Sequence, residues 1–500
     1  MGSILTTRQT LELHKAIVQY LAPVLEKPTL DAVCQALDTS LDPATVANYL
    51  EKKWLTVLRL QKKILDLENE VNSYKALIAQ ANSAGNGAVL VSKDKINWLP
   101  STVSKVYPTQ TSQIVNAVAV HPKLPLLVAA CADGLMIAWD IASDDPTIPQ
   151  KLWNAHTRSV HALQWSLEPI DLSTAQTTLE KGLYILASCS LDLSIKIWAG
   201  DMLKHVRTLT GHEHTVSAVA FLPTNPTYLY SVSRDRSVKV WDLISGFCVA
   251  SFVGHSDWVR NVDVAAINSR LLLGSAKKSA PLGDFLLTCS NDQSVRLSHH
   301  LGTGLSMLLG HAHVIETARF LPMPANRHID KYILQNIDRF PYLLEAIVNN
   351  PVYTDSLGFK YCVSAGRDNL IKLWLLPPPV LLPHRPPQAS VQNNAQGWHI
   401  LDLVGHQSWV KLVETHPNGR FIISGADDKT VKVWDIASLV DQGKVTCVKT
   451  LHAHDGFVNA VHFARFEMAG LGDDALKLIE KSMRCLFFSA GTDNTVRLWQ

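Results

Sequence analysis

The chain lacks several features that would point to a particular class of protein. Its eight cysteines include no Cys-x-x-Cys pair, so neither a zinc cluster nor a dithiol redox site is expected. The net charge of +2 at pH 7 provides no long-range attraction for nucleic acid or a membrane surface. No signal peptide opens the chain, and the apolar stretch 370–383 cannot span a bilayer because it contains Lys372 and four prolines. The sequence therefore predicts a soluble, intracellular protein without nucleic-acid binding or membrane insertion.

Charged residues are scarce as well. They make up 18% of the 500 residues, against 47% hydrophobic residues, so the chain can bury a substantial core. A chain of this length is too long for one small core, which favours a large repeat fold or several domains. Four cysteines stand in apolar, strand-like runs and are predicted to be small buried thiols: Cys131, Cys189, Cys289 and Cys362.

One short pattern recurs seven times. An aspartate stands six positions before a tryptophan, and β-rich runs such as 228–232 and 237–241 flank a polar turn, which is typical of a hairpin. The copy around Asp292 has Ser298 where tryptophan is expected. The other six copies are Asp133/Trp139, Asp192/Trp198, Asp235/Trp241, Asp368/Trp374, Asp428/Trp434 and Asp493/Trp499.

A Gly-His or Ala-His pair stands before most copies, ahead of another alternating strand. The pairs are 155–156, 211–212, 254–255, 310–311, 405–406 and 453–454. This pattern resembles the WD-repeat family, whose β-propeller blades each have four antiparallel strands. The resemblance covers about residues 103–500 and implies an all-β, seven-bladed propeller.

Histidine and aspartate held together can be catalytic or structural. The four strands of a blade are called a to d in chain order. The WD-repeat resemblance implies that a histidine in the loop between strand d of one blade and strand a of the next (the d–a loop) bonds the aspartate in the turn between strands b and c (the b–c turn). His156 stands in a variant pair, with alanine before it in place of glycine. The other implied pairs are His212/Asp235, His255/Asp292, His311/Asp368, His406/Asp428 and His454/Asp493. Catalysis needs one tuned pKa in one cleft, whereas a pair repeated in six blades is scaffold. No additional nucleophile, metal cluster or phosphate loop stands beside any copy, so we expect no enzyme, no catalytic residue, no metal and no cofactor.

The copies are unevenly spaced, and most spacings exceed the usual ~40–45 residues. The excess is expected to form loops, most clearly at 322–358, 376–397 and 464–482. The chain ends one residue after Trp499, which leaves the seventh blade without its last strand. Because an open edge invites aggregation, a propeller closes by taking that strand from the other terminus. The predicted donor is 104–107.

The N-terminal 102 residues are of a different kind. An apolar stripe at helical spacing comprises Leu13, Ile17, Tyr20 and Leu21, and a second short helix is predicted within 30–41. Two short helices with little core tend to dimerise, so residues 1–43 are predicted to be a dimerisation region. Residues 83–102 are predicted to be a flexible linker.

Residues 44–82 carry a heptad repeat. The a positions are Val57, Ile64, Val71 and Ile78, and the d positions are Leu60, Leu67 and Tyr74. β-Branched residues at a with leucine at most d positions favour a parallel two-stranded coiled coil. An amphipathic helix packed on the propeller is the alternative, but it would have no reason to match Lys63 with Glu68 and Glu70 with Lys75 across two chains. We therefore expect a parallel homodimer.

The apolar stripe at Leu13, Ile17, Tyr20 and Leu21 resembles a LisH motif. Together with the coiled-coil segment Leu50 to Lys63 and seven WD repeats, it is similar to the lissencephaly-type dynein regulators. This is the nuclear distribution protein family, called NudF or Pac in fungi, and the long inserts resemble a divergent fungal member. The resemblance implies a non-catalytic homodimer that binds the dynein heavy-chain motor domain and modulates its microtubule attachment and motility. It also implies roles in nuclear migration and spindle positioning, a NudE-type coiled-coil adaptor as partner, and an indirect link to the machinery of microtubule plus ends and the spindle pole.

Basic residues beside the repeat aspartates gather in blades three, five and six. The family's motor-contact positions map onto this sector, at Arg234, Arg260, Arg367, Trp409 and Lys429, and we expect the four basic side chains to have exposed heads. One cationic, aromatic sector on a nearly neutral protein suits an acidic protein surface. A second family contact maps onto Glu213 and His214.

Two other functions are open. A ubiquitin-ligase substrate receptor could also join LisH to WD repeats, but the W-D-x-R sequence of such receptors has Ala142, Ile244 and Ala437 in place of arginine here. The other is a non-catalytic subunit of a lipid acetylhydrolase, as in animal relatives.

Replacing both Ile64 and Leu67 by lysine should convert the dimer into monomers, because two charges per chain would enter the seam. Sedimentation at micromolar concentration measures this mass. An unchanged dimer mass would contradict the coiled-coil assignment, or show that the LisH region alone suffices for dimerisation.

Overall fold

The chain forms two compact units, Met1–Ile96 and Asn97–Gln500. The predicted coiled coil, Leu13 and most of the linker lie outside the described residues. The computed structural model describes residues 14–39 (except 16, 19 and 24), 99–109, 113–172 (except 144), 182–265 (except 201 and 224), 284–381 (except 301, 341 and 342), 386–463 (except 391–395) and 487–499.

The described part of the N-terminal unit contains helix α2 (Lys27–Ala36), which begins and ends earlier than the sequence predicted. Pro28 lies in its first turn, where its fixed φ and missing N–H are tolerated. Nδ1 of His14 lies 3.1 Å from the carbonyl oxygen of Leu37, which ties the segment before α2 to the residue after it. Val18, absent from the predicted stripe, is 1% exposed, whereas Tyr20 is 50% exposed.

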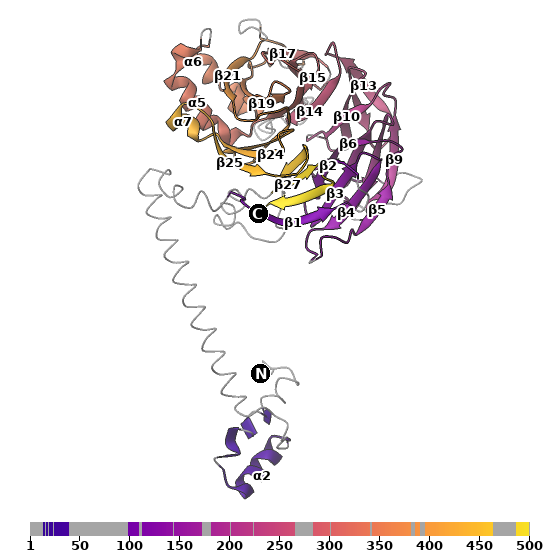
Figure 1. Cartoon of the computed structure of the whole chain (residues 1–500), viewed down its shortest axis with the longest axis vertical. Helices are drawn as coiled ribbons and strands as arrows, with labels where there is room; N and C mark the ends of the chain where they lie inside the picture. The colour runs from indigo at the N-terminus through magenta and orange to yellow at the C-terminus, as the bar shows by residue number, and fades with distance from the viewer. Residues whose placement is uncertain are drawn as a thin grey trace, which may run out of the picture. The chain divides into compact units, whose positions relative to one another are not determined.

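In the second unit, the described strands form seven four-stranded antiparallel sheets, which are the blades of a propeller (Figure 1). Blades one to three comprise β2 (Val115–Val120), β3 (Leu126–Cys131), β4 (Leu135–Asp140) and β5 (Lys151–Asn154); β6 (Val160–Trp165), β7 (Ile185–Ser190), β8 (Ser194–Ala199) and β9 (Lys204–Thr210); and β10 (Val216–Phe221), β11 (Tyr228–Ser233), β12 (Ser237–Asp242) and β13 (Cys248–Val253).

Blades four to six comprise β14 (Val259–Ala265), β15 (Phe285–Ser290), β16 (Ser294–His299) and β17 (Gly304–Leu309); β18 (Ile315–Phe320), β19 (Tyr361–Gly366), β20 (Ile371–Leu375) and β21 (Trp398–Leu403); and β22 (Val410–Thr415), β23 (Phe421–Ala426), β24 (Thr430–Asp435) and β25 (Thr446–His452). Blade seven comprises β26 (Val458–Phe463), β27 (Phe487–Gly491), β28 (Thr495–Trp499) and β1 (Val103–Pro108). The first strands of neighbouring blades contact one another in a closed ring.

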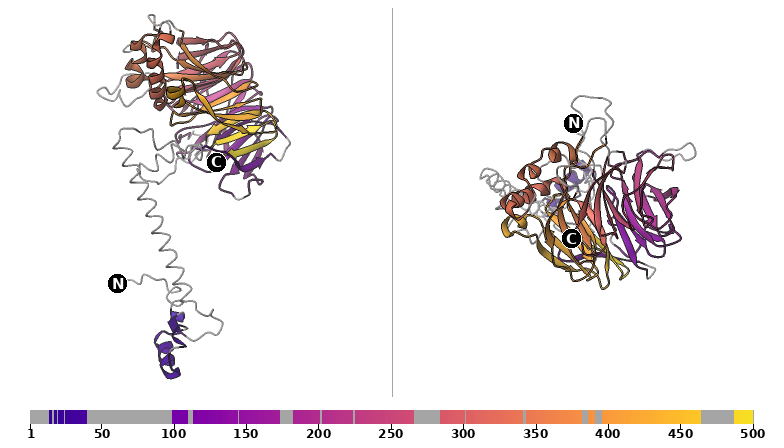
Figure 2. Two further views of the ribbon diagram at one scale, coloured as in Figure 1. Left: turned by 60° about the vertical axis from the view of Figure 1, so that its left-hand side comes forward. Right: turned by 90° about the horizontal axis from the view of Figure 1, so that it is seen from above.

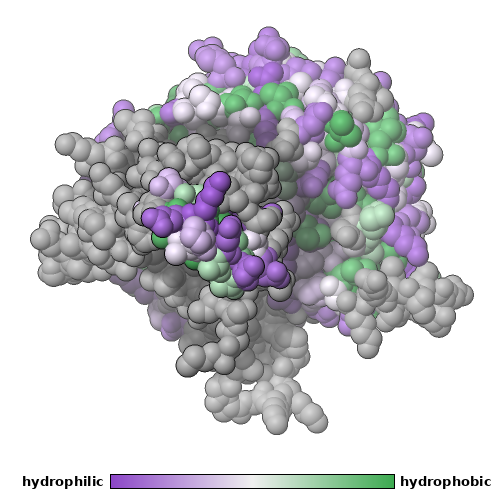
Figure 3. Space-filling view, turned by 90° about the horizontal axis from the view of Figure 1, so that it is seen from below, coloured by the Kyte–Doolittle hydropathy of each residue, from purple (hydrophilic) through white to green (hydrophobic). Residues whose placement is uncertain are grey.

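Burial follows the place of each strand in its blade. Second strands such as β3 and β19 are buried at every residue, because neighbouring blades cover both of their faces. The four cysteines predicted to be buried thiols lie on these second strands and are fully buried. An outer strand such as β13 has only exposed and half-buried residues. Viewed from below, hydrophobic residues (green) lie on the described surface among hydrophilic ones (purple) (Figure 3).

The propeller closes with the N-terminal strand, as the sequence predicted. β1 pairs antiparallel with β28 and completes the sheet order β1-β28-β27-β26 (Figure 1). Tyr107 of β1 is fully buried, with its ring 5.7 Å from that of Trp139 in blade one and 6.3 Å from that of Phe488 in blade seven. The strand therefore fills the seam between the last blade and the first.

The insert 322–358 is not a loop, so that prediction was wrong. It forms η2 (Met323–Ala325), α5 (Asn326–Gln335), η3 (Ile337–Arg339), α6 (Glu345–Val348) and the π-helical η4 (Tyr353–Leu357), which cluster at one side of the propeller (Figure 2). Ile329, Tyr332 and Ile333 form an apolar stripe within the same core cluster as blade five. α5 also contacts α7 (Ser438–Gln442), a helix of blade six.

A partly buried ion pair anchors the helical insert. Nζ of Lys360 lies 2.5 Å from Oδ1 of Asp330 and donates to the carbonyl of Val348 at 2.6 Å. Burial lowers the pKa of Lys360, although Asp330 opposes the shift. The described residues of the neighbouring insert at 376–397 form no helix or strand, as predicted for a loop, and Val380 and Gln388 pair through both backbone amides. The third insert, 464–482, lies outside the described residues. No helix among the described residues is long and apolar enough to cross a membrane.

Tyr107→Ala should lower the free energy of unfolding by about 3–5 kcal/mol, because it leaves a large cavity in the closing seam. Val106→Ala is the matched control, since Val106 is 40% exposed on the same strand, and it should cost well under half as much. Chemical denaturation of both variants measures the difference. Equal losses would mean that β1 contributes only its backbone pairing.

Candidate protein-binding site

Each of five blades contains a chain of four side chains that joins its core to one end of the propeller. In blade three, the indole nitrogen of Trp241 lies 2.8 Å from Oγ of Ser231, which lies 2.6 Å from Nε2 of His212. Nδ1 of His212 lies 2.7 Å from Oδ2 of Asp235. Because an indole N–H can only donate and a carboxylate can only accept, each group donates to the next, from tryptophan to aspartate.

The histidines and aspartates that the repeat pairs are brought together in six blades. The distances from histidine Nδ1 to the nearest aspartate oxygen are 2.9 Å for His156/Asp192, 2.7 Å for His212/Asp235, 2.9 Å for His255/Asp292, 2.8 Å for His311/Asp368, 2.8 Å for His406/Asp428 and 2.9 Å for His454/Asp493. In blade four, Thr288 replaces the serine and Ser298 replaces the tryptophan.

A Ser–His–Asp chain is also the arrangement of a serine hydrolase, but this one has no access for a substrate. Ser231 is fully buried, and its hydroxyl already receives the indole N–H of Trp241. Five copies of the same chain, each with a buried serine, fix loops in place and leave no hydroxyl poised for attack. Among the described residues, no group of three or more His, Cys, Asp or Glu could hold a metal ion.

Each aspartate also organises its own turn. Asp235 accepts the hydroxyl and amide of Ser237 at 2.6 and 2.9 Å and the amide of Glu213 at 3.0 Å. Arg236, directly after it, has a φ of 69°, in the left-handed region that this tight turn requires. The d–a loop and the b–c turn are thus held at the same end of the blade. We call this end of the propeller the loop face.

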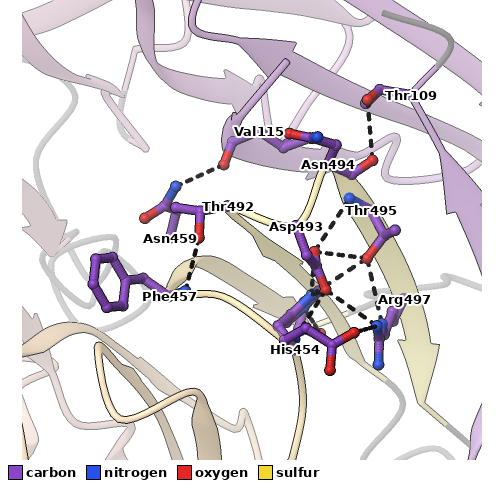
Figure 4. Close-up of polar contacts among 12 residues, drawn as sticks. Thr109, Val115, His454, Phe457, Asn459, Thr492, Asp493, Asn494, Thr495 and Arg497 are labelled. Atoms are coloured by element: carbon purple, nitrogen blue, oxygen red, sulfur yellow. Dashed lines mark hydrogen bonds and ion pairs between the residues drawn. The ribbon is translucent and has the colours of Figure 1, made fainter. Parts of the chain in front are cut away.

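Blade seven adds a fifth member to this network (Figure 4). Nη2 of Arg497 lies 3.1 Å from Oδ2 of Asp493, beside His454 and Thr495. Blade one is the exception, because residues 109–114 contain no histidine. There the hydroxyl of Thr109 donates to the carbonyl of Asn494 at 3.0 Å, so blade seven holds the loop instead (Figure 4).

The network shifts the pKa of its carboxylates. Burial raises the pKa of Asp235, but hydrogen bonds from His212 and Ser237 outweigh burial and hold it well below its ordinary value. The net direction is the same for the partners of the other five histidines, which are Asp192, Asp292, Asp368, Asp428 and Asp493. These aspartates therefore remain charged at neutral pH.

The basic and aromatic residues of the predicted sector lie on the loop face, and most of them touch. The guanidinium carbon of Arg234 lies 4.8 Å from the ring centre of Trp258, and that of Arg260 lies 5.7 Å from the same ring. In blades five and six, the guanidinium carbon of Arg367 lies 4.5 Å from the ring centre of Trp409. The contacts of Arg234 and Arg367 cross from one blade to the next, whereas Arg260 and Trp258 both belong to blade four.

Glu316 joins the two stacks. Its Oε1 lies 2.6 Å from Nε of Arg367, and its Oε2 lies 3.7 Å from Nη1 of Arg260. Nε of Arg260 also donates to Oδ1 of Asn291 at 2.7 Å. The result is a continuous row, Arg234–Trp258–Arg260–Glu316–Arg367–Trp409, which we call the arginine–tryptophan row.

The expectation that all four basic heads are exposed was wrong for the three arginines, and Arg234 is half-buried against Trp258. The side chain of Arg260 is 16% exposed and that of Arg367 is 24% exposed, because each is paired with Glu316 and lies against an indole. Lys429 is exposed, in the b–c turn of blade six, and Trp409 is 42% exposed. Replacing these arginines would therefore disturb the blade seams as well as the surface charge.

The second predicted contact adjoins the row. Glu213 and His214 are both exposed, and the His214 ring centre lies 5.9 Å from that of Trp258. Sequence reasoning had singled out neither Trp258 nor Glu316 as a site residue. Trp258 could have been found from its position, since it follows its repeat histidine by three residues, as Trp409 does. Glu316 could not, because an acidic residue argues against a cationic site.

Comparison with known proteins gives two findings. The model of the WD domain, G-beta repeat, matches residues 101–140, 203–242, 246–297, 397–435 and 445–500. The chain is 53% identical to a protein of Scheffersomyces stipitis and 52% identical to one of Meyerozyma guilliermondii. These alignments cover 100% and 99% of this chain and 99% and 100% of those proteins. A Candida albicans protein is 48% identical, with 99% of each chain covered, and all three are called nuclear distribution protein PAC1.

Asp235→Ala should reduce the free energy of unfolding by about 1–3 kcal/mol, because it leaves a buried N–H of His212 without an acceptor. Asp133→Ala in blade one is the matched control, and without a histidine to release it should change stability by only about 0.5 kcal/mol. A catalytic role would instead show as lost activity at unchanged stability.

The same pair of variants tests the pKa shift. The folded-state pKa of Asp235 is depressed below the unfolded value of about 3.9, so its contribution is complete above that pH and declines as the pH falls. Thermal melts at pH 7 and at about pH 3 should therefore show a smaller gap between wild type and Asp235→Ala at the lower pH.

Proposed function

The chain belongs to the family of the nuclear distribution protein PAC1, and on this premise we propose that it is a non-catalytic, homodimeric regulator that binds the motor domain of cytoplasmic dynein. The proposed contact is the basic sector of the loop face, consisting of Arg234, Arg260, Arg367, Trp409 and Lys429. Glu213 and His214 would add a second contact at its edge.

The observation that carries this proposal is the arginine–tryptophan row. Tryptophan and arginine are the residues most enriched among those that dominate binding energy at protein interfaces. Here they are already ordered by stacking and by Glu316, so less side-chain entropy is lost when a partner binds. A chain with a net charge of only +2 has concentrated cationic side chains at this place, which favours an acidic protein surface over a general polyanion.

Binding at this surface would modulate the attachment of dynein to microtubules and its motility, and so support nuclear migration and spindle positioning. The names of the relatives, which refer to nuclear distribution, agree with this role. The protein would act in the cytoplasm, at microtubule plus ends and the spindle pole, together with a NudE-type adaptor. A parallel dimer through 44–82 would present two propellers, and two linked sites raise the effective concentration of the second binding event.

A pulldown from cell extract tests the proposed function against its alternatives. Recovery of dynein heavy chain is expected. Recovery of ligase subunits or of an acetylhydrolase without dynein would instead support a substrate receptor or an enzyme subunit.

Two substitutions should affect dynein binding in different ways. Trp409→Ala removes a half-exposed aromatic and should raise the off-rate by about 30-fold, the equivalent of ~2 kcal/mol. Lys429→Ala removes an exposed charge, so it should mainly slow association and weaken the salt dependence. Surface binding kinetics with purified motor domain, measured at several salt concentrations, separate the two effects.

Leu193→Ala is the control for Lys429→Ala. Leu193 also follows a repeat aspartate and has a φ of 69°, against 67° for Lys429, but it lies in blade two outside the basic sector. It should bind dynein like the wild type, and Leu191→Ala beside it should do so too. If these controls lose dynein as severely as Trp409→Ala, the partner contacts the whole loop face and the sector is wrong.

A further inference from the structure

One acidic residue lies within the cationic sector. Glu316 is the second residue of β18, the position that Arg260 holds in β14 and Lys411 holds in β22. Three consecutive blades thus place a positive, a negative and a positive side chain at equivalent sites. The side chain of Glu316 is 16% exposed, so most of it is shielded from water by the row around it.

The contacts of Glu316 fix the orientation of two guanidinium groups. It accepts Nε–H of Arg367 at 2.6 Å, and the guanidinium carbon of Arg367 also lies 4.5 Å from the ring centre of Trp409. An arginine has five N–H donors, so binding through Nε leaves the donors of the terminal nitrogens for another acceptor. Arg260 is held in a similar way, between Glu316, Asn291 and Trp258.

Like charges crowd this region, and Glu316 offsets them. Burial lowers the pKa of Arg234, and the nearby Arg260 and Arg367 lower it further, whereas Glu316 acts in the opposite direction. Without a carboxylate between them, Arg260 and Arg367 would repel each other across the seam of blades four and five. Each would then be expected to swing toward solvent, where a long side chain samples many rotamers.

We infer that Glu316 is a positioning residue of the binding surface, which holds Arg260 and Arg367 in the orientation that receives acidic side chains of the partner. This inference rests on the proposed function for the identity of the partner, but not for the geometry. It predicts an effect opposite to that of simple charge. Removing a negative charge from a cationic surface should strengthen binding to an acidic partner, whereas releasing the two arginines should weaken it.

The main test is Glu316→Gln in the full-length protein, with binding to purified dynein motor domain measured by surface kinetics. We expect the affinity to fall about tenfold. The matched control is Asp402→Asn, because Asp402 also lies in blade five and bridges two side chains, Lys372 at 2.8 Å and His399 at 2.7 Å. It makes the same change in net charge outside the sector and should leave the affinity unchanged.

A second variant separates position from charge without removing the carboxylate. Glu316→Asp keeps the negative charge but is one methylene shorter, so it cannot reach both arginines as Glu316 does. Weaker binding by Glu316→Asp supports positioning, whereas wild-type binding by this variant overturns it. This variant also covers the case in which Glu316→Gln lowers the melting temperature too far to be measured.

A readout without dynein tests the geometry alone. Phenylglyoxal modifies accessible guanidinium groups, and mass spectrometry gives the rate at each arginine. Glu316→Gln should raise the rates at Arg260 and Arg367 several-fold, while the exposed Arg236 serves as an internal reference. Unchanged rates at both arginines would overturn the positioning role.

A combined variant shows whether Glu316 acts through the arginines. In the background of Arg260→Ala and Arg367→Ala, adding Glu316→Gln should cause no further loss of motor binding, whereas independent effects would add. Equal or tighter binding by Glu316→Gln alone would overturn the inference. If the wild-type protein does not bind the motor domain, the proposed function fails, and the modification rates still decide whether Glu316 positions the arginines.

Discussion

The hydrogen bond from a loop histidine to the aspartate of the neighbouring turn is the constraint on which the loop face depends. In blade three it continues a chain that starts at Trp241 in the core, passes through Ser231 and ends at the turn around Asp235. Every donor in the chain has one acceptor, so a buried polar group is satisfied at each step. Because the chain recurs from blade to blade, equivalent positions in the sequence become equivalent positions in space. The residue just before the aspartate therefore meets the residue three after the next histidine at two seams, where Arg234 lies against Trp258 and Arg367 against Trp409.

This regularity explains why much of the molecule could be predicted from the sequence. The strand period and the Asp-to-Trp spacing carry the resemblance to WD repeats, and that resemblance implied seven blades. The missing last strand then predicted β1 as the closing strand, because every edge needs a partner. The helices of the insert 322–358 were missed, since their apolar stripe at Ile329, Tyr332 and Ile333 is short and the expectation was set by repeat length. The helices are stable through packing against blade five and α7, which a sequence window does not contain.

The sequence predicted on which face the residues of the basic sector lie, but it misjudged how far their side chains are exposed to solvent. The positions of Arg260 and Arg367 within their repeats place them on the loop face, and solvent exposure is the ordinary expectation for arginine. Arg260 is covered by Trp258 of its own blade and by Glu316 of the next blade. Arg367 is covered by Glu316 of its own blade and by Trp409 of the next blade. Nothing in the spacing of one repeat reveals which side chain of the next repeat will cover it. Net charge misleads for the same reason, since a sum over the chain says nothing about three arginines gathered around one carboxylate.

The arginine–tryptophan row crosses three blade seams. Arg234 of blade three lies on Trp258 of blade four, Arg260 of blade four pairs with Glu316 of blade five, and Arg367 of blade five lies on Trp409 of blade six. The contacts of Arg260 with Trp258 and of Glu316 with Arg367 each lie within one blade, but the complete row, and with it the proposed binding surface, needs four blades packed together. The loop histidines and aspartates would therefore support the proposed binding at a distance, without touching the partner. A substitution in that scaffold and one in the row can both weaken binding, and only the loss of folding stability distinguishes the first from the second.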